Sequence, residues 1–156
     1  MTGATMKQSN PATERIVEPM IALARCSKRE RILVAGSNSA EVMSALHRCG
    51  YARVTTTASC GLPAGQHDVA LVDARQRSVK VLETTLDWLV EFVAPNGVLV
   101  IWVDAQERAG NKGLRSAIES HGFLIEAGTM HDDGSAVSAR RCEKAPSPGR
   151  TVLFER

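Results

Sequence analysis

The chain has 156 residues, of which 44% are hydrophobic and 23% are charged. This length and apolar content predict one globular domain with a buried core. The 19 basic and 17 acidic residues nearly balance, so the net charge of +2 provides no strong field that would draw the chain to nucleic acid or to a membrane surface.

No hydrophobic segment approaches the roughly 20 apolar residues that cross a membrane. The N-terminal stretch "MTGATMKQSNPATER" also lacks the apolar centre of a secretory signal. We therefore expect a cytoplasmic protein without a membrane partner.

The cysteines are widely and irregularly spaced, which argues against a zinc site and against a disulfide framework. Two of them fall near the ends of predicted helices, where we expect small buried thiols. These two are Cys26 and Cys49, and the others are Cys60 and Cys142.

Residues 1–9 are polar, and we expect them to be disordered, which leaves a single domain over residues 10–156. Asn10 and Pro11 are typical of a helix N-cap and first helical residue, because proline lacks the N–H that is unpaired there. Apolar residues at helical spacing predict that this helix continues to about Cys26.

A short apolar run from Ile32 to Ala35 lies between charged residues and Gly36, which predicts a strand buried on both faces. Ser39 is predicted to cap the helix that follows, and Gly50 to end it. The apolar side of that helix consists of Val42, Ala45, Leu46 and Cys49.

The middle of the chain repeats this order. The β-branched segment Arg53–Thr57 and the apolar segment Asp68–Asp73 are predicted strands, and the composition of "SCGLPAGQ" predicts a loop between them. Ser78 is predicted to open a helix with a long apolar stripe, which the turn Pro95–Gly97 then stops.

The last third contains the most apolar strand, "VLVIWV" from Val98, and then a helix over about Lys112–His121. A strand is predicted over Phe123–Glu126, followed by a polar loop with glycine and proline. Thr151–Glu155 is predicted to be a final strand, which pairs antiparallel because no clear helix precedes it.

Alternating strands and helices with right-handed crossovers predict a doubly wound, mostly parallel α/β sheet. Helices are expected on both faces, and the C-terminal strand is expected to be antiparallel. The two stretches "HRCGYARV" and "ESHGFLIE" support this order, since each has a helical last turn, a glycine able to adopt positive φ, and a following strand.

The order of the predicted elements and the sequence motifs of residues 31–156 resemble those of the class I S-adenosylmethionine-dependent methyltransferases, a Rossmann-like family. "LDWLVEFVAPNGVLVIW" resembles the family's helix, turn and fifth strand, and "GLRSAIESHGFLIEAG" resembles the helix and sixth strand that follow. "HDVALVD" resembles the strand before the family's substrate-facing loop, and "TVLFER" resembles the closing seventh strand. The resemblance implies a shortened methyltransferase-like fold, with S-adenosylmethionine as the family's cofactor.

The chain departs from the family where the cofactor binds. The family has an acidic residue at the end of the first strand and then three alternating glycines, whereas this chain has Val34, Gly36, Asn38 and Ala40 at those places. The carboxylate that accepts the ribose hydroxyls falls on Ala58, an omission that costs about 1.5–3 kcal/mol of binding energy. The short link to the next strand leaves no room for the helix, strand and helix of the family, so we expect the adenine wall to be missing.

The candidate cofactor-binding residues are Gly36, Ser37 and Asn38 of the turn, with Asp73 at the carboxyl end of its strand, where open α/β sheets hold ligands. Asp73 and Asp104 are candidates for an acidic pocket, although strand-end aspartates also commonly cap turns. A phosphorylated Asp73, as in a response-regulator receiver, needs paired carboxylates for magnesium after the first strand, and "VAGSNS" has none. No catalytic residue is identified.

The histidines share neither metal nor triad spacing, and no serine lies in a nucleophile elbow. The cluster His131–Asp133 is interpreted as a solvated loop rather than a cation site. Trp88 and Trp102 fall in apolar elements and are predicted to be core or interface residues. The basic residues late in the chain are also interpreted as part of a solvated loop, because no aromatic residues that could stack on bases lie between them. They are Arg140, Arg141, Lys144 and Arg150.

These observations favour a reduced methyltransferase-like domain that has lost cofactor binding and acts as a binding or regulatory module. Its expected partner is another protein or a second copy of the chain. The alternative is an active S-adenosylmethionine-dependent methyltransferase acting on a small molecule, and a third hypothesis is a different nucleotide at the same strand edge.

Overall fold

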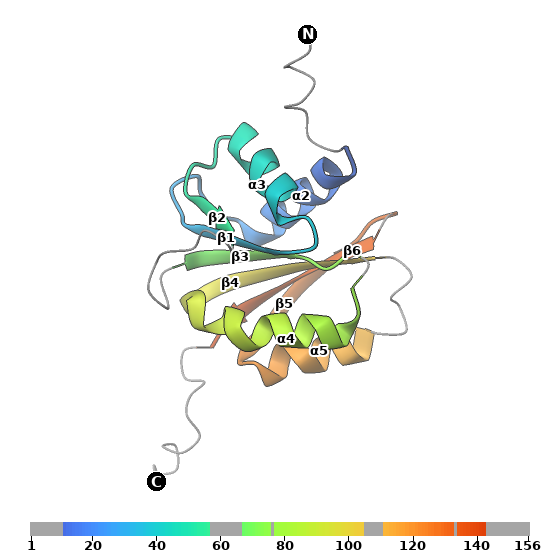
Figure 1. Cartoon of the computed structure of the whole chain (residues 1–156). Helices are drawn as coiled ribbons and strands as arrows, with labels where there is room; N and C mark the ends of the chain where they lie inside the picture. Colours follow the sequence, from blue (N-terminus) through green and yellow to red (C-terminus); the bar gives the residue numbers. More distant parts are fainter. Residues whose placement is uncertain (1–10, 57–66, 76, 105–110, 133, 143–156) are drawn as a thin grey trace.

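The computed structural model describes residues 11–56, 67–75, 77–104, 111–132 and 134–142. They form a six-stranded sheet of order β2-β1-β3-β4-β6-β5 (Figure 1). The first four strands along this order are parallel, whereas β6 runs antiparallel to both of its neighbours. The strands are β1 (Ile32–Gly36), β2 (Val54–Thr56), β3 (His67–Asp73), β4 (Val93–Asp104), β5 (Phe123–Met130) and β6 (Gly134–Arg141).

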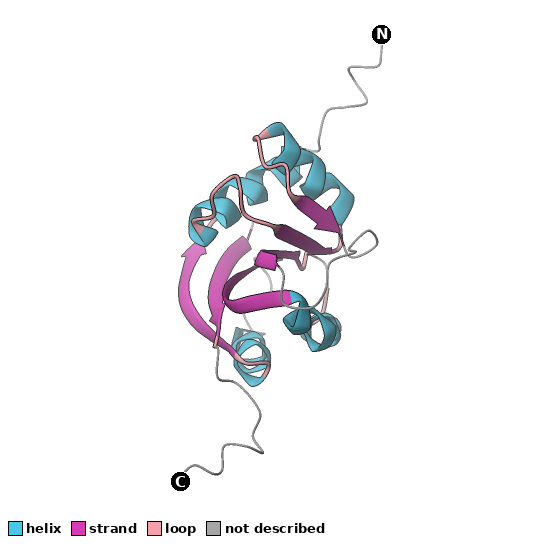
Figure 2. Cartoon of the chain, turned by 90° about the vertical axis from the view of Figure 1, so that its left-hand side faces the viewer, coloured by secondary structure: helices cyan, strands magenta, loops and turns pink. Residues whose placement is uncertain are grey.

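Helices cover both faces of the sheet (Figure 1), and the view turned by 90° shows the strands between two helical layers (Figure 2). One layer consists of α2 and α3, and the other of α4 and α5. This arrangement confirms the predicted doubly wound fold with an antiparallel ending. The helices are α2 (Pro11–Ala24), α3 (Ser39–Arg48), α4 (Val79–Leu89) with the 3-10 turn η1 (Val90–Phe92), and α5 (Asn111–Ser120).

The side chains of β1 alternate between two hydrophobic cores. Leu33 packs toward α4 and α5, whereas Ile32 and Val34 pack toward α2 and α3. Because both faces of the strand are covered, the sequence here is continuously apolar instead of alternating. Burial of one such side chain stabilises the fold by about 1.5–3 kcal/mol.

Capping residues and glycines in the sequence predicted most helix ends correctly. The Ser78 side chain caps α4 by accepting a hydrogen bond from the Val81 N–H at 3.2 Å. Gly50 and Gly122 adopt positive φ after α3 and α5, as both repeated stretches predicted. Ser39, however, is the first residue of α3 rather than its cap.

The predicted helix after Ser78 is too long at its C-terminal end. The α-helix ends at Leu89 and tightens into η1, and Val93 already belongs to β4. Because Val93 pairs with His67 of β3, the turn Pro95–Gly97 is an irregularity inside a strand and does not terminate the helix.

The antiparallel strand in the described part of the chain is β6, which lies in a segment that the sequence predicted to be a polar loop. Most of its residues are small or polar, and Gly134, Ala136, Ser138 and Ala139 are buried in the strand that pairs with β4 on one side and β5 on the other. Pairing with β6 also extends β5 to Met130, beyond the predicted end at Glu126. The predicted strand Thr151–Glu155 lies outside the described residues.

The late basic residues also differ from the prediction of a solvated loop. Arg140 lies in β6 and donates to Glu126 Oε2 at 2.9 Å, and Arg141 donates to the carbonyl of Val93. Lys144 and Arg150 lie outside the described residues.

The predicted burial of the helix-end cysteines is wrong for Cys49, which is exposed, whereas Cys26 is half-buried. Burial, followed by the nearby charge of Glu30, raises the pKa of the Cys26 thiol to about 11. This thiol is therefore protonated at neutral pH.

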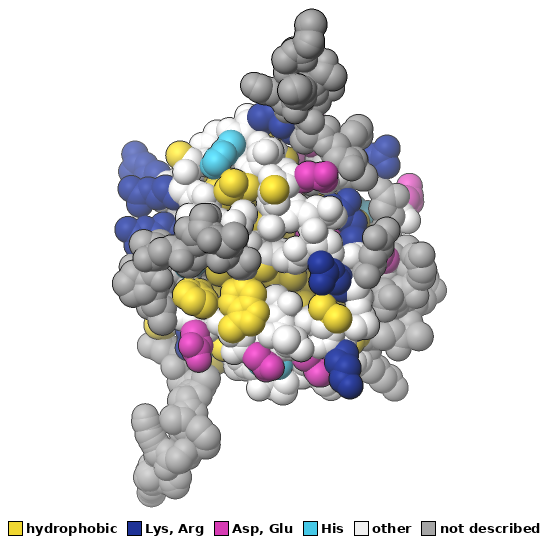
Figure 3. Space-filling view, viewed as in Figure 1, with side chains coloured by type: hydrophobic (Ala, Val, Ile, Leu, Met, Phe, Trp, Pro, Cys, Tyr) yellow, Lys and Arg dark blue, Asp and Glu magenta, His cyan; other side chains and the backbone are white. Residues whose placement is uncertain are grey.

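The two tryptophans differ in burial. Trp102 is 1% exposed in the core between the sheet and α2 and α3. Trp88 is half-buried on α4 and meets Phe92 edge-on, with the ring centroids 6.0 Å apart. Hydrophobic side chains gather over α4 on the face seen in Figure 3, with charged side chains beside them. Among the described helices, none combines the length and apolar character needed to span a membrane.

His67, at the start of β3, is buried and connects three elements. Its Nδ1 lies 3.2 Å from the carbonyl oxygen of Phe92, and its Nε2 lies 3.3 Å from the hydroxyl of Thr55. Because a carbonyl only accepts, Nδ1 carries the proton and Nε2 of the neutral ring accepts from Thr55. Burial lowers the pKa of His67 below its ordinary value of 6.5.

We therefore expect His67→Gln to reduce stability by about 1–2 kcal/mol where the ring is neutral. The stabilisation from a group with a lowered pKa is complete above 6.5 and is lost as the pH falls toward the folded-state pKa. Urea unfolding of both proteins should show a larger difference in unfolding free energy above that pH than below it. An equal difference at both pH values would contradict a neutral, buried His67.

Candidate functional site

The turn after β1 is built on a close contact between two strand ends. Gly36 pairs with Asp73 of β3 and has φ of 108°. A Cβ at position 36 would lie 2.2 Å from the carbonyl oxygen of Asp73, so only glycine fits. The next N–H, that of Ser37, donates to the same carbonyl at 2.8 Å. The one glycine that this turn retains is therefore required by the sheet itself.

The carboxylate of Asp73 is 1% exposed and is bound by Arg75, two residues further along the chain. Arg75 Nη2 lies 2.6 Å from Oδ2, Nε lies 2.9 Å from Oδ1, and the backbone N–H also donates to Oδ1 at 3.1 Å. This bidentate geometry is the strongest form of carboxylate recognition by a side chain. The hydrogen bond to Asp73 raises the pKa of Arg75, against the opposing effect of burial.

Three residues from other elements extend this ion pair. Thr13 of α2 accepts from Arg75 Nη2 at 3.2 Å and donates to Glu41 Oε1 of α3 at 2.8 Å. Asn38 Nδ2 donates to Asp73 Oδ2 at 3.4 Å. We call Thr13, Asn38, Glu41, Asp73 and Arg75 the carboxyl-edge cluster, because it lies at the carboxyl ends of β1 and β3.

Ser37 is engaged by the same segment. Its hydroxyl donates to the carbonyl of Arg75 at 2.8 Å and accepts from Arg77 Nε at 3.0 Å. The structure thus brings together all four predicted cofactor-binding residues, and each contacts other residues of the chain itself.

Asp104 ends β4, two strands from Gly36, and its charge contributes to the raised pKa of Arg75. The predicted pairing of Asp73 with Asp104 in an acidic pocket is therefore incomplete, because the Arg75 guanidinium neutralises Asp73. Sequence analysis missed Thr13, Glu41 and Arg75. The one sequence signal was the basic residue in "DAR", directly after the strand.

The other candidates form no common site. His47 lies in α3, His67 in β3, and His121 directly after α5. His131 lies between β5 and β6, with its ring centroid 5.5 Å from that of Trp102. Within the described ranges, no group of three or more histidine, cysteine or acidic side chains is placed to hold a metal ion. Asp133, Ala58 and Cys60 lie outside those ranges.

Comparison with solved structures identifies the fold. The chain is similar to the ribosomal protein L11 methylase of Lactobacillus delbrueckii subsp. bulgaricus, with a TM-score of 0.59 and 12% identity over 86% of this chain and 81% of that one. It is similar to the 1,6-didemethyltoxoflavin-N1-methyltransferase of Burkholderia thailandensis, solved with bound S-adenosylhomocysteine, with a TM-score of 0.56 and 14% identity over 84% and 79% of the two chains.

A third similar structure, the [4+2]-cyclase SpnF, has a TM-score of 0.59 and 13% identity over 83% of this chain and 80% of that one. No protein-family model matches the sequence, and a search of curated proteins finds no match. The solved structures confirm the methyltransferase-like fold that the sequence predicted. At these identities they show a shared fold and leave the activity open.

We expect Gly36→Ala to destabilise the protein by about 3 kcal/mol or more, because it combines positive φ with overlap against the Asp73 backbone. Gly113→Ala in α5 is the matched control. Its new Cβ would meet Val79 at an ordinary distance of 3.6 Å, so the alanine should leave stability unchanged or raise it by about 0.5–1 kcal/mol. Urea unfolding measures both, and equal effects would refute the role given to Gly36.

We expect Arg75→Gln to cost about 3 kcal/mol, since it leaves the buried Asp73 carboxylate without its guanidinium. Adding Asp73→Asn should recover part of that loss, because the buried charge is then removed. Arg77→Gln, at an exposed position in the same segment, should change stability by less than about 0.5 kcal/mol. A double-mutant cycle measures the coupling, and strictly additive effects of the Asp73 and Arg75 changes would argue against the ion pair.

Proposed function

We propose that this chain is a methyltransferase-like domain that does not bind S-adenosylmethionine and acts as a binding or regulatory module. The proposal rests on the carboxyl-edge cluster. Open α/β sheets hold ligands at the carboxyl ends of their strands. In this chain the carboxylate at the end of β3, Asp73, is buried and already paired with Arg75.

The energetics of this edge support the proposal. A ligand that needs Asp73 must first displace Arg75, and breaking a buried ion pair costs about 3–5 kcal/mol. The turn also has Val34, Asn38 and Ala40 where the family has an acidic residue and two glycines. Binding of the cofactor here would therefore be weakened by the free energy needed to displace Arg75 and by the loss of several contacts that the family makes.

The competing function is an active methyltransferase acting on a small molecule. It is considered because solved structures with a similar fold include one in complex with S-adenosylmethionine and one with bound S-adenosylhomocysteine. That function requires Arg75 to swing away from Asp73 and the turn residues Gly36–Asn38 to contact the cofactor. The two functions thus differ in one measurable property, which is affinity for the cofactor.

As a module, the domain acts through its surface on a protein partner or on a second copy of itself. The near-neutral net charge of +2 agrees with this proposal, because it provides little attraction to nucleic acid.

Isothermal titration with S-adenosylmethionine and S-adenosylhomocysteine tests the proposal. We expect no saturable heat with either compound, because the cluster occupies the site. The 1,6-didemethyltoxoflavin-N1-methyltransferase, which was solved with bound S-adenosylhomocysteine, is a suitable positive control when it is titrated with the same stocks. Amide signals of Ser37 and Asn38, followed by NMR, locate any compound that does bind.

Micromolar binding that perturbs the Ser37 and Asn38 amides would overturn the proposal in favour of the methyltransferase. In that case Asn38→Leu should weaken binding, because it places an apolar side chain in the turn without altering Gly36. Light scattering of the purified chain measures whether a second copy is the partner.

A further inference from the structure

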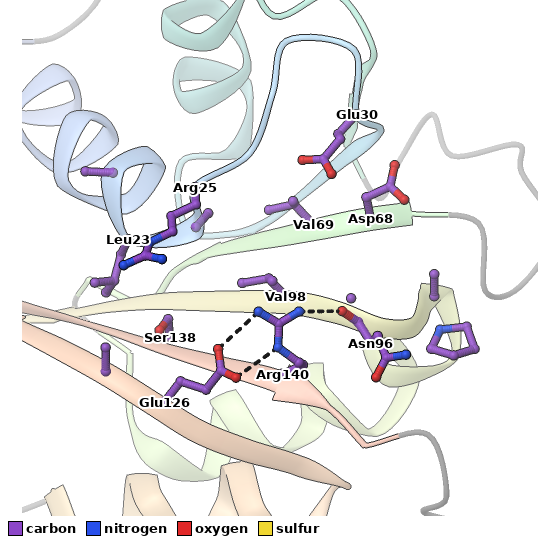
Figure 4. A pocket seen from close by; sticks show the side chains of 16 residues that line it. Leu23, Arg25, Glu30, Asp68, Val69, Asn96, Val98, Glu126, Ser138 and Arg140 are labelled. Carbon is purple, nitrogen blue, oxygen red and sulfur yellow. Dashed lines mark hydrogen bonds and ion pairs between the residues drawn. The ribbon is translucent and has the colours of Figure 1, made fainter.

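A cavity of about 470 Å³ lies at the amino ends of β3 and β4, at the opposite end of the sheet from the carboxyl-edge cluster (Figure 4). It opens on the sheet face that α2 covers, beside the C-terminal end of that helix. Val69 of β3 and Val98 of β4 line it with apolar surface, as does Leu23 of α2. Its volume is within the range of small-molecule sites, which is roughly 300–1,000 Å³.

Two residues in the cavity wall adopt positive φ, a conformation that asparagine tolerates and that strains an arginine. Within the described residues, the non-glycine positions with positive φ are Arg25 at 55° and Asn96 at 67°, and both line this cavity. Arg25 directly follows α2, at a position where glycine is the usual choice. An arginine there costs about 1–2 kcal/mol relative to an unstrained residue, and such strain is concentrated at ligand sites.

One of the two cationic side chains in the cavity has no partner in the described structure. Arg140 donates to Glu126 Oε2 at 2.9 Å and to the carbonyl of Asn96 at 3.0 Å, so its charge is neutralised. The guanidinium of Arg25 projects over the cavity (Figure 4), and no hydrogen bond or ion pair to it occurs within the described ranges. It is therefore available to an anionic group.

Glu30, in the turn before β1, and Asp68 of β3 line the side of the cavity away from Arg25 (Figure 4). Glu30 Oε1 accepts from the Ser27 N–H at 3.0 Å, and Asp68 Oδ2 accepts from the Arg31 N–H at 3.0 Å. Each carboxylate thus has one oxygen bonded to a backbone N–H, and within the described residues no hydrogen bond to its second oxygen is found, so that oxygen can accept from a donor on a ligand.

These charges select a class of ligand. With Arg140 and Glu126 neutralising each other, one guanidinium and two carboxylates remain, and this balance repels a multiply charged anion such as a phosphate ester. A molecule with both a carboxylate and an ammonium group satisfies both walls. We propose that this cavity binds a small zwitterion of the class of free amino acids and dipeptides. The proposal is independent of the carboxyl-edge cluster and of its proposed loss of cofactor binding.

The test is an NMR titration of the full chain with a panel of free L-amino acids and dipeptides, reading the amides of Arg25, Asn96 and Gly97. At least one zwitterion should shift them saturably. Its N-acetylated form, which lacks the ammonium, and its carboxamide, which lacks the carboxylate, should each bind at least about tenfold more weakly. Inorganic phosphate should not bind.

Arg25→Gly is the decisive variant, because glycine relieves the strain at φ of 55° while removing the guanidinium. It should be at least as stable as the parent protein and bind the zwitterion at least about tenfold more weakly. Arg29→Gln, at an exposed position that directly precedes Glu30 in the sequence and does not line the cavity, should bind like the parent.

Three results would each overturn the proposal: no saturable shift with any member of the panel, phosphate binding as tight as that of the zwitterion, or unchanged affinity in Arg25→Gly. None of them bears on the cofactor titration, which is read at Ser37 and Asn38. The two proposals can therefore fail separately.

Discussion

The close approach of Gly36 to the backbone of Asp73 is the contact on which the carboxyl edge of this protein depends. It brings the ends of β1 and β3 together without space for a Cβ, and the Ser37 N–H bonds across the junction. The same junction buries the Asp73 carboxylate, and a buried carboxylate requires a partner. Arg75 is that partner, and through Thr13 it also anchors the N-terminal helix to the sheet.

This contact explains how the turn after β1 can keep the backbone shape of a cofactor-binding turn without binding a cofactor. A glycine that the sheet requires is retained whether or not a cofactor is bound, so Gly36 alone is no evidence of catalysis. The similar solved structures agree with this separation, since they include methyltransferases and a [4+2]-cyclase. The fold supplies an edge, and the side chains at that edge decide its use.

The two ends of the sheet differ in what fills them. At the carboxyl end, Asp73 and Arg75 satisfy each other. At the amino end, a cavity of about 470 Å³ is bordered by Arg25, which has positive φ and no partner in the described structure, and by Asn96, which also has positive φ. In our proposals, this domain binds a ligand at the amino ends of its strands, whereas open α/β sheets usually bind ligands at the carboxyl ends.

Local sequence patterns by themselves determined the order of strands and helices as far as β5, together with the Ser78 cap and the glycine endings, because each depends on residues that are close in the chain. They also placed Gly36 and Asp73 at one edge, since the carboxyl ends of neighbouring parallel strands must meet. Only the tertiary structure decided what surrounds these residues. Arg75 bonds Thr13 across 62 positions, and Gly134–Arg141 forms a strand through its pairing with β4 and β5. Such long-range contacts leave no local pattern, so neither the paired state of Asp73 nor the cavity beside Arg25 was visible in the sequence.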